Sequence, residues 1–115
     1  MNEKNLLKEI FKILDEKKAT DIIILDMRKL TTITDYFIIA TANSTTHLKA
    51  LAKEIFLTMK EKFNLIPLNS LNENEDKWML IDYQDFIIHL FIKEAREFYN
   101  LEDLWFEAKR IKIKY

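Results

Sequence analysis

The chain has 115 residues, which is enough for one hydrophobic core and too few for two ordinary domains. It contains no cysteine, and this excludes disulfide bonds, thiolate nucleophiles and cysteine-ligated zinc. The formal net charge is −1, but four of the last seven residues are Lys or Arg, so the rest of the chain is acidic. A chain that is acidic outside its tail is poorly suited to bind nucleic-acid phosphates over a broad surface, although the basic tail can contact nearby RNA.

The N-terminal half of the chain predicts two helices and two buried strands. Apolar residues recur at three- and four-residue spacing over residues 2–18, which is typical of an amphipathic helix. The continuous runs of β-branched and aromatic residues in 21–27 and 36–40 predict strands buried on both faces. Ser44, Thr45 and Thr46 are good capping residues for a second helix over residues 45–63.

The C-terminal half predicts shorter elements. Residues 65–68 contain the only proline, which suggests an edge strand or a strand end. Residues 78–81 and 86–92 are predicted strands, joined by a four-residue hairpin turn without glycine, in which we expect Gln84 to take a positive φ. Residues 111–115 alternate apolar and basic side chains, and this pattern fits either an additional edge strand or an unordered tail.

These elements predict an α/β or α+β fold. The strand, helix and strand in the middle of the chain indicate a parallel crossover, while the hairpin adds an antiparallel pair, so the sheet should be mixed. No stretch rich in Gly, Pro or Ser divides the chain, and we predict one domain over residues 1–107 followed by a basic tail over 108–115. The chain has neither a secretion signal nor an apolar run of membrane length, so we expect a cytoplasmic protein.

The segment from Asp82 to Trp105 combines aromatic, charged and turn residues more densely than the rest of the chain. A strand that carries one histidine leads directly into a short helix with an arginine, and large aromatics beside arginine are typical of binding surfaces. If the two long helices leave one face of the sheet uncovered, aromatics on that face need a partner. We therefore predict that a partner is bound by Trp78, Tyr83, His89, Phe91, Arg96, Phe98, Tyr99 and Trp105.

Catalytic interpretations of the chain rest on weaker patterns. His89 shares a predicted sheet face with Ile87 and Phe91, and a contact or bracing role is favoured because no nucleophile accompanies it. Asp26 and Asp35 together with His89 can serve a magnesium-dependent nucleotidyl or phosphoryl transferase, but no close acidic pair and no phosphate-binding loop support this. We predict no catalytic residue, no metal and no cofactor; the transferase and a small RNA-binding module remain the alternatives.

His47 lies at the predicted start of the second helix, beside Asn43 and Ser44. Such a group can bind an anion at the helix amides, or it can simply cap the helix. Phosphate-binding turns usually contain glycines, and this turn has none, so capping is favoured.

The order and spacing of these motifs resemble the ribosomal silencing factor family, also called the Iojap-type family. The matching stretches are Ile24-Leu25-Asp26, residues 34–41, Asn43-Ser44, His47 and residues 78–105. The resemblance extends over about residues 4–106, and it implies a mixed, mostly five-stranded sheet flanked by helices with a nucleotidyltransferase-like topology. It also implies a non-enzymatic translational repressor that binds the large ribosomal subunit through the L-fourteen protein, blocks joining with the small subunit and can pair as a homodimer.

Overall fold

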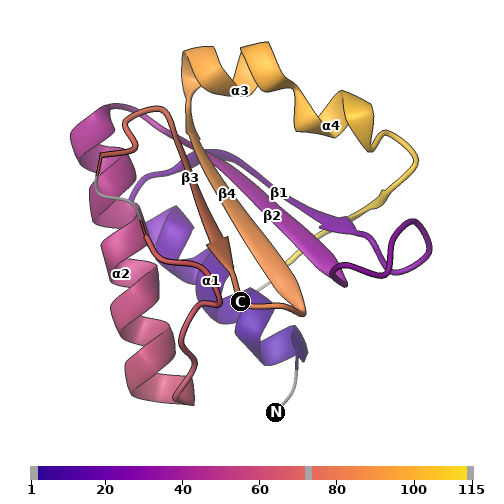
Figure 1. Ribbon diagram of the computed structural model, residues 1–115, viewed down its shortest axis with the longest axis horizontal. Helices are drawn as coiled ribbons and strands as arrows, with labels where there is room; N and C mark the ends of the chain where they lie inside the picture. Colours follow the sequence, from indigo (N-terminus) through magenta and orange to yellow (C-terminus); the bar gives the residue numbers. More distant parts are fainter. Residues whose placement is uncertain (1–2, 72–73, 114–115) are drawn as a thin grey trace.

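The computed structural model describes residues 3–71 and 74–113, which form a five-stranded mixed sheet with helices on both faces (Figure 1). The elements in chain order are α1 (Glu3–Glu16), β1 (Thr20–Asp26), β2 (Tyr36–Ala42), α2 (Thr45–Phe63), β3 (Trp78–Asp82), β4 (Phe86–Ile92), α3 (Lys93–Tyr99), α4 (Leu101–Leu104) and β5 (Lys109–Ile111). The strand order in the sheet is β3-β4-β2-β1-β5. The predicted fold class, with its mixed five-stranded sheet, is confirmed.

The two central strands of the sheet, β2 and β4, are parallel to each other, and all other neighbouring strands are antiparallel. In this parallel pair, Ile39 lies opposite His89. The helix α2 lies between β2 and β3 in the chain, and the predicted hairpin follows it as β3 and β4. Within the described residues, no helix is long and apolar enough to cross a membrane.

The chain has no glycine, so other residues take its place where the backbone needs a positive φ. Asn64 and Asn100 adopt this conformation at the ends of α2 and α3, where asparagine tolerates it best. Gln84 has a φ of 73° in the hairpin turn, as predicted. The helix α1 ends at Glu16, earlier than the predicted residue 18, and Lys18 follows it with a φ of 67°.

No strand forms over residues 65–68, and this part of the prediction is wrong. The backbone N–H of Leu68 donates to the carbonyl of Asp82 at 2.7 Å, but the next bonds to β3 come from a side chain. The carboxamide of Asn69 donates to the carbonyl of Leu80 at 2.7 Å and accepts from the N–H of Asp82 at 2.9 Å. Asn69 therefore takes the place of a neighbouring strand at this edge of the sheet.

The basic tail enters the sheet. Lys109–Ile111 pairs with β1 as the edge strand β5, so an edge strand forms, but it begins two residues earlier than the predicted 111–115 and shares only Ile111 with it. Ile111 and Ile113 pack against the core from this edge. Residue 2 of the predicted first helix and residues 114–115 of the predicted tail lie outside the described residues.

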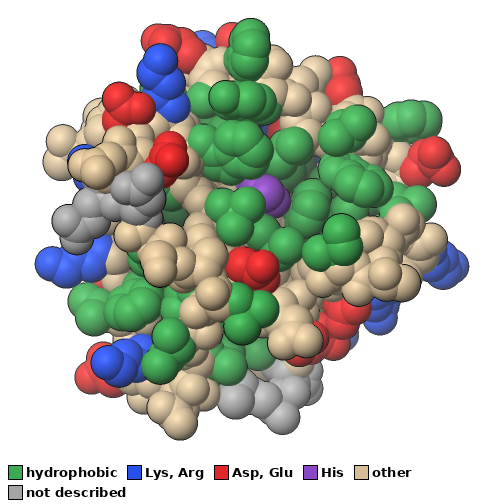
Figure 2. Space-filling view, viewed as in Figure 1, with side chains coloured by type: hydrophobic (Ala, Val, Ile, Leu, Met, Phe, Trp, Pro, Cys, Tyr) green, Lys and Arg blue, Asp and Glu red, His purple; other side chains and the backbone are tan. Residues whose placement is uncertain are grey.

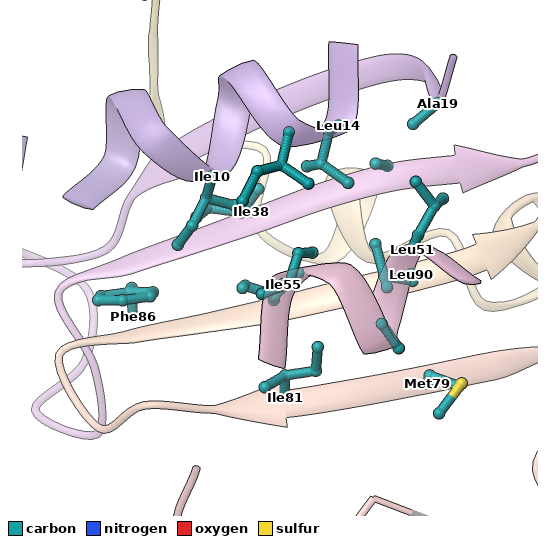
Figure 3. Packing of buried hydrophobic residues seen from close by; sticks show 14 of the residues in the cluster. Ile10, Leu14, Ala19, Ile38, Leu51, Ile55, Met79, Ile81, Phe86 and Leu90 are labelled. Atoms are coloured by element: carbon teal, nitrogen blue, oxygen red, sulfur yellow. The ribbon is translucent and has the colours of Figure 1, made fainter. Parts of the chain in front are cut away.

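The main core lies between the sheet and the two long helices. Leu14 of α1 and Leu51 and Ile55 of α2 point at the sheet, where Ile38 and Leu90 meet them (Figure 3). Each of these side chains is at most 1 % exposed. The three- and four-residue spacing of apolar positions on the helices thus matches one continuous apolar sheet face.

Candidate docking surface

The second face of the sheet is covered only in part. A smaller core cluster lies there, formed by buried Leu25, Met27, Ile39, Phe91, Ala95 and Ala108. The helices above it are α3 and α4, with seven and four residues, and they cross only one end of the sheet (Figure 1). Figure 2 shows hydrophobic side chains gathered around a histidine over the middle of the molecule. Most of this face therefore has no helix to cover it.

A chain of aromatic rings crosses the second face from α4 to α3. Trp105 meets Phe37 edge to face at 6.1 Å between ring centroids, and Phe37 meets His89 in the same way at 4.7 Å. Trp78 continues the row, with its ring 5.8 Å from His89 and 4.7 Å from Tyr99. These rings come from β2, β3, β4, α3 and the residue after α4, so the surface exists only in the folded chain.

His89 is the central and most deeply buried member of this row of rings, in contact with both Phe37 and Trp78 and with 4 % exposure. The indole N–H of Trp78 donates to Nδ1 of His89 at 3.2 Å, so the imidazole proton resides on Nε2. Burial lowers the pKa of His89 to about 4, and the ring is therefore neutral near pH 7. Nε2 has no hydrogen-bond partner among the described residues. The geometry makes His89 a brace that orients Trp78.

The α3–α4 arm, residues 93–105, carries several of the most exposed apolar side chains. Phe98 is 81 % exposed and Tyr99 is 49 % exposed, and their rings pack edge to face at 5.1 Å. Leu104, the neighbouring Phe106, and Ile33 in the β1–β2 loop are exposed as well. Exposed aromatic side chains on a short arm beside an uncovered sheet face are typical of a protein-binding surface.

Arg96 attaches the arm to the sheet. Its Nη1 donates to the carbonyl of Asp21 and to Oγ1 of Thr41, which lies 2.8 Å away. Its Nε forms an ion pair with Glu102 of α4 at 3.3 Å, and the Arg96 side chain is only 11 % exposed. One guanidinium thus connects α3 to β1, β2 and α4, which explains how two short helices keep a fixed position.

The structure separates the eight predicted partner-binding residues into three groups. Phe98 and Tyr99 are exposed, Trp78 is half-buried against Tyr99, and Trp105 is half-buried at the other end of the row of rings, against Phe37. His89 and Phe91 are buried under the same surface, and the Arg96 side chain is used internally. Tyr83 is buried in the other cluster, against Phe86, so it lies away from this surface. Whether the accessible residues contact a partner remains a prediction.

Sequence reasoning missed several members of the surface. Phe37 lies in a continuous apolar strand, where no alternation reveals which side chains face which helix. Ile33 shares the β1–β2 loop with Met27 and Leu30, so its apolar character alone does not show that it is the exposed one. Leu104 and Phe106 lie on either side of Trp105, and their exposure depends on where the short helix α4 ends.

The structure keeps Asp26 and Asp35 apart from His89, although the N–H of Met27 donates to the carbonyl of Asp35 beside Asp26. Asp26 accepts bonds from Arg28, and this pairing holds the pKa of its carboxyl below its usual value. Alternation along β1 places Asp26 on the side of Ile24, toward α1, whereas His89 lies under the second face. Residues 3–71 and 74–113 contain no group of three potential metal ligands.

His47 has a structural role. Ser44 is the N-cap of α2, and its Oγ accepts from the N–H of His47, as the capping prediction required. Nδ1 of the His47 ring accepts from the N–H of Asn43 at 2.9 Å, and Nε2 lies 2.6 Å from the carbonyl of Lys17. The ring thereby connects the start of α2 to the chain just after α1.

Comparisons with known proteins agree with this architecture. The family model described as "Ribosomal silencing factor during starvation" matches residues 1–115. A ribosomal silencing factor of Bacillus subtilis is 38 % identical over 109 residues, covering 94 % of this chain and 91 % of that protein. The chloroplast protein Iojap of Arabidopsis thaliana is 34 % identical, covering 93 % of this chain and 44 % of that longer protein.

Solved structures give the same result. A crystal structure from Chromobacterium violaceum is 29 % identical, covers 100 % of this chain and 94 % of that chain, and superimposes with a TM-score of 0.86. A crystal structure from Bacillus halodurans, also 29 % identical, covers 96 % of this chain and 99 % of that chain with a TM-score of 0.82. The chain therefore belongs to the ribosomal silencing factor family, a family with a ribosome-associated role in silencing translation.

Proposed function

We propose that this protein docks on the large ribosomal subunit through the partly covered sheet face and the α3–α4 arm. The observation that carries the proposal is the exposure of Phe98 and Tyr99 at one end of a row of rings that includes the half-buried Trp78 and Trp105. Exposing such a group of aromatic side chains to water is unfavourable in free energy, and a protein partner that buries them removes this penalty. Family membership supplies the ribosome as the partner.

The proposed contact on the large subunit is the L-fourteen ribosomal protein, as the family resemblance implies. A stable protein–protein interface buries roughly 1,200–2,000 Å² in total, and a few aromatic anchors supply most of its binding energy. The proposed mechanism is steric: the bound domain occupies part of the subunit interface, and the small subunit is excluded by overlap. Silencing by this mechanism needs binding affinity and steric bulk but no chemical step, which agrees with the separation of Asp26 from His89.

We also propose that two free copies pair through the same face. A second copy offers the same exposed aromatics, and a two-fold interface buries them on both partners at once. Sedimentation equilibrium of the free protein should then detect a dimer, and Phe98→Glu should shift it toward monomer. A dimer that persists unchanged in this variant would locate the pairing surface elsewhere.

Co-sedimentation with purified large subunits tests the docking proposal. The wild-type chain should pellet with large subunits at low and moderate salt, and it should reduce the yield of joined ribosomes when small subunits are added. The double variant Phe98→Glu/Leu104→Glu should bind at least about a hundredfold more weakly, since each change places a charge where an apolar anchor is expected.

A matched control is available on the other side of the molecule. Ile66 is 63 % exposed beside α2, so Ile66→Glu makes the same chemical change far from the arm. This variant should bind and block joining as the wild type does. Normal binding by Phe98→Glu/Leu104→Glu, or lost binding by Ile66→Glu alone, would contradict the proposal.

A further inference from the structure

A second surface, which is charged, lies at the β5 edge of the sheet, the edge opposite β3. A groove of about 1,020 Å³ runs there between the start of α1, the turn after β1, and β5. Six of the twelve residues that line it are cationic, whereas only Glu3 and Asp26 are acidic. The cationic residues are Lys4, Lys8, Arg28, Lys109, Arg110 and Lys112. A groove with this excess of positive charge is unexpected in a chain whose net charge is −1.

The charges in the groove are only partly neutralised by the protein itself. Asp26 is occupied by Arg28, at 2.7 Å. Among the described residues, no carboxylate lies within ion-pair distance of Lys8, Arg110 or Lys112. Clustered cations without counterions repel one another and attract polyanions from solution.

The backbone holds these cations in a fixed arrangement. Arg110 pairs with Leu25 in the β1–β5 ladder, and Lys109 pairs with Asp26. Ile111 and Ile113 pack against the main core, so by alternation Arg110 and Lys112 are directed to the Leu25 side of the edge, whereas Lys109 shares the α1 side with Asp26. The basic segment is thus tied to the sheet through β5, so its backbone has a fixed position and its cations lie on both sides of this edge.

We infer that this basic groove binds the phosphate backbone of RNA. The concave shape and the mixture of Lys and Arg suit a phosphate chain, and the family's ribosome association supplies RNA as the abundant polyanion. No base-reading side chain is required, so the contact is independent of sequence. The inference is separate from the docking surface, which lies over β2, β3 and β4, whereas the groove lies at the β5 edge of the sheet, and each can fail without the other.

Fluorescence anisotropy with a labelled oligouridylate tests the inference on the whole chain. Contacts from Lys8, Lys109, Arg110 and Lys112 predict a loss of affinity of roughly 50-fold between about 50 and about 200 mM salt, because each released counterion contributes to the slope. The variant Lys8→Gln/Arg110→Gln/Lys112→Gln should retain roughly a threefold dependence over the same range and bind weakly throughout.

A control variant removes the same charge from another surface. Lys49→Gln/Lys53→Gln/Lys60→Gln, on the exposed side of α2, should keep the wild-type affinity and salt dependence. Phe98→Glu/Leu104→Glu should also keep RNA binding, which separates this test from that of the docking surface. Three results would overturn the inference: no RNA binding at about 50 mM salt, equal losses in the groove and α2 variants, or binding to phosphatidylserine vesicles in place of RNA.

Discussion

The two faces of the sheet differ in how completely helices cover them. On one face, α1 and α2 contribute 14 and 19 residues and bury a continuous core. On the other, α3 and α4 contribute seven and four residues, and aromatic side chains there stay partly exposed. The strand β4 serves both faces, since Phe86, Ile88 and Leu90 face one and His89 and Phe91 face the other. The first face supplies the main hydrophobic core, and the second presents the surface proposed for docking.

The same substitution on the two faces should have very different effects on stability. Leu51→Ala removes a side chain that is 1 % exposed between α2 and the sheet, and it should lower the free energy of unfolding by about 3 kcal/mol. Leu104→Ala changes a side chain that is 68 % exposed and should cost less than about 0.5 kcal/mol. Urea denaturation measures both. Similar losses in the two variants would show that the second face is packed as tightly as the first.

Among the residues of the second face, Arg96 should contribute most to holding α3 and α4 in place. Arg96→Ala leaves Glu102 without its ion-pair partner and removes the bonds to Asp21 and Thr41, so we expect a loss of about 2–3 kcal/mol. Hydrogen exchange should increase in α3 and α4 more than in α2. Uniform exchange changes throughout the chain would instead indicate that the arm and the main core unfold as one unit.

Acid should weaken the fold through His89. Burial lowers its pKa to about 4 in the folded chain, whereas an unfolded histidine titrates near pH 6.5, so the unfolded state binds more protons between these values. Stability is complete above about pH 6.5 and should fall by about 2 kcal/mol between pH 7 and pH 5. Urea denaturation across this range measures the loss. In His89→Gln the slope should become much smaller, and an unchanged slope would assign the effect to another group.

The smallest effect is expected at Tyr83, on the well-covered face. Its hydroxyl is buried without a hydrogen-bond partner among the described residues, and burial raises its pKa to about 12. Tyr83→Phe removes an unsatisfied polar group, so stability should stay the same or rise by up to about 1 kcal/mol. Binding to large subunits should not change. A clear loss of stability in thermal unfolding would mean that the hydroxyl has a partner in solution.

Much of the fold could be predicted because local chemistry determines it. The second helix was predicted over residues 45–63 and the strand over 86–92, and both agree with α2 and β4. Apolar periodicity, a capping serine and a run of β-branched residues are local signals, and they do not depend on the rest of the chain. The positive φ of Gln84 follows in the same way from a hairpin turn without glycine.

The candidate site was predictable only in part, because its accessibility depends on tertiary structure. The sequence by itself indicated a segment from Asp82 to Trp105 that is rich in aromatic residues and contains Arg96. Only the folded chain decided that Tyr83 packs into the main core, that Arg96 bonds to β1 and β2, and that Phe37 joins the surface. A strand run that is apolar at every position is compatible with burial on either face, so the lengths and positions of the covering helices determine which aromatics remain in contact with solvent.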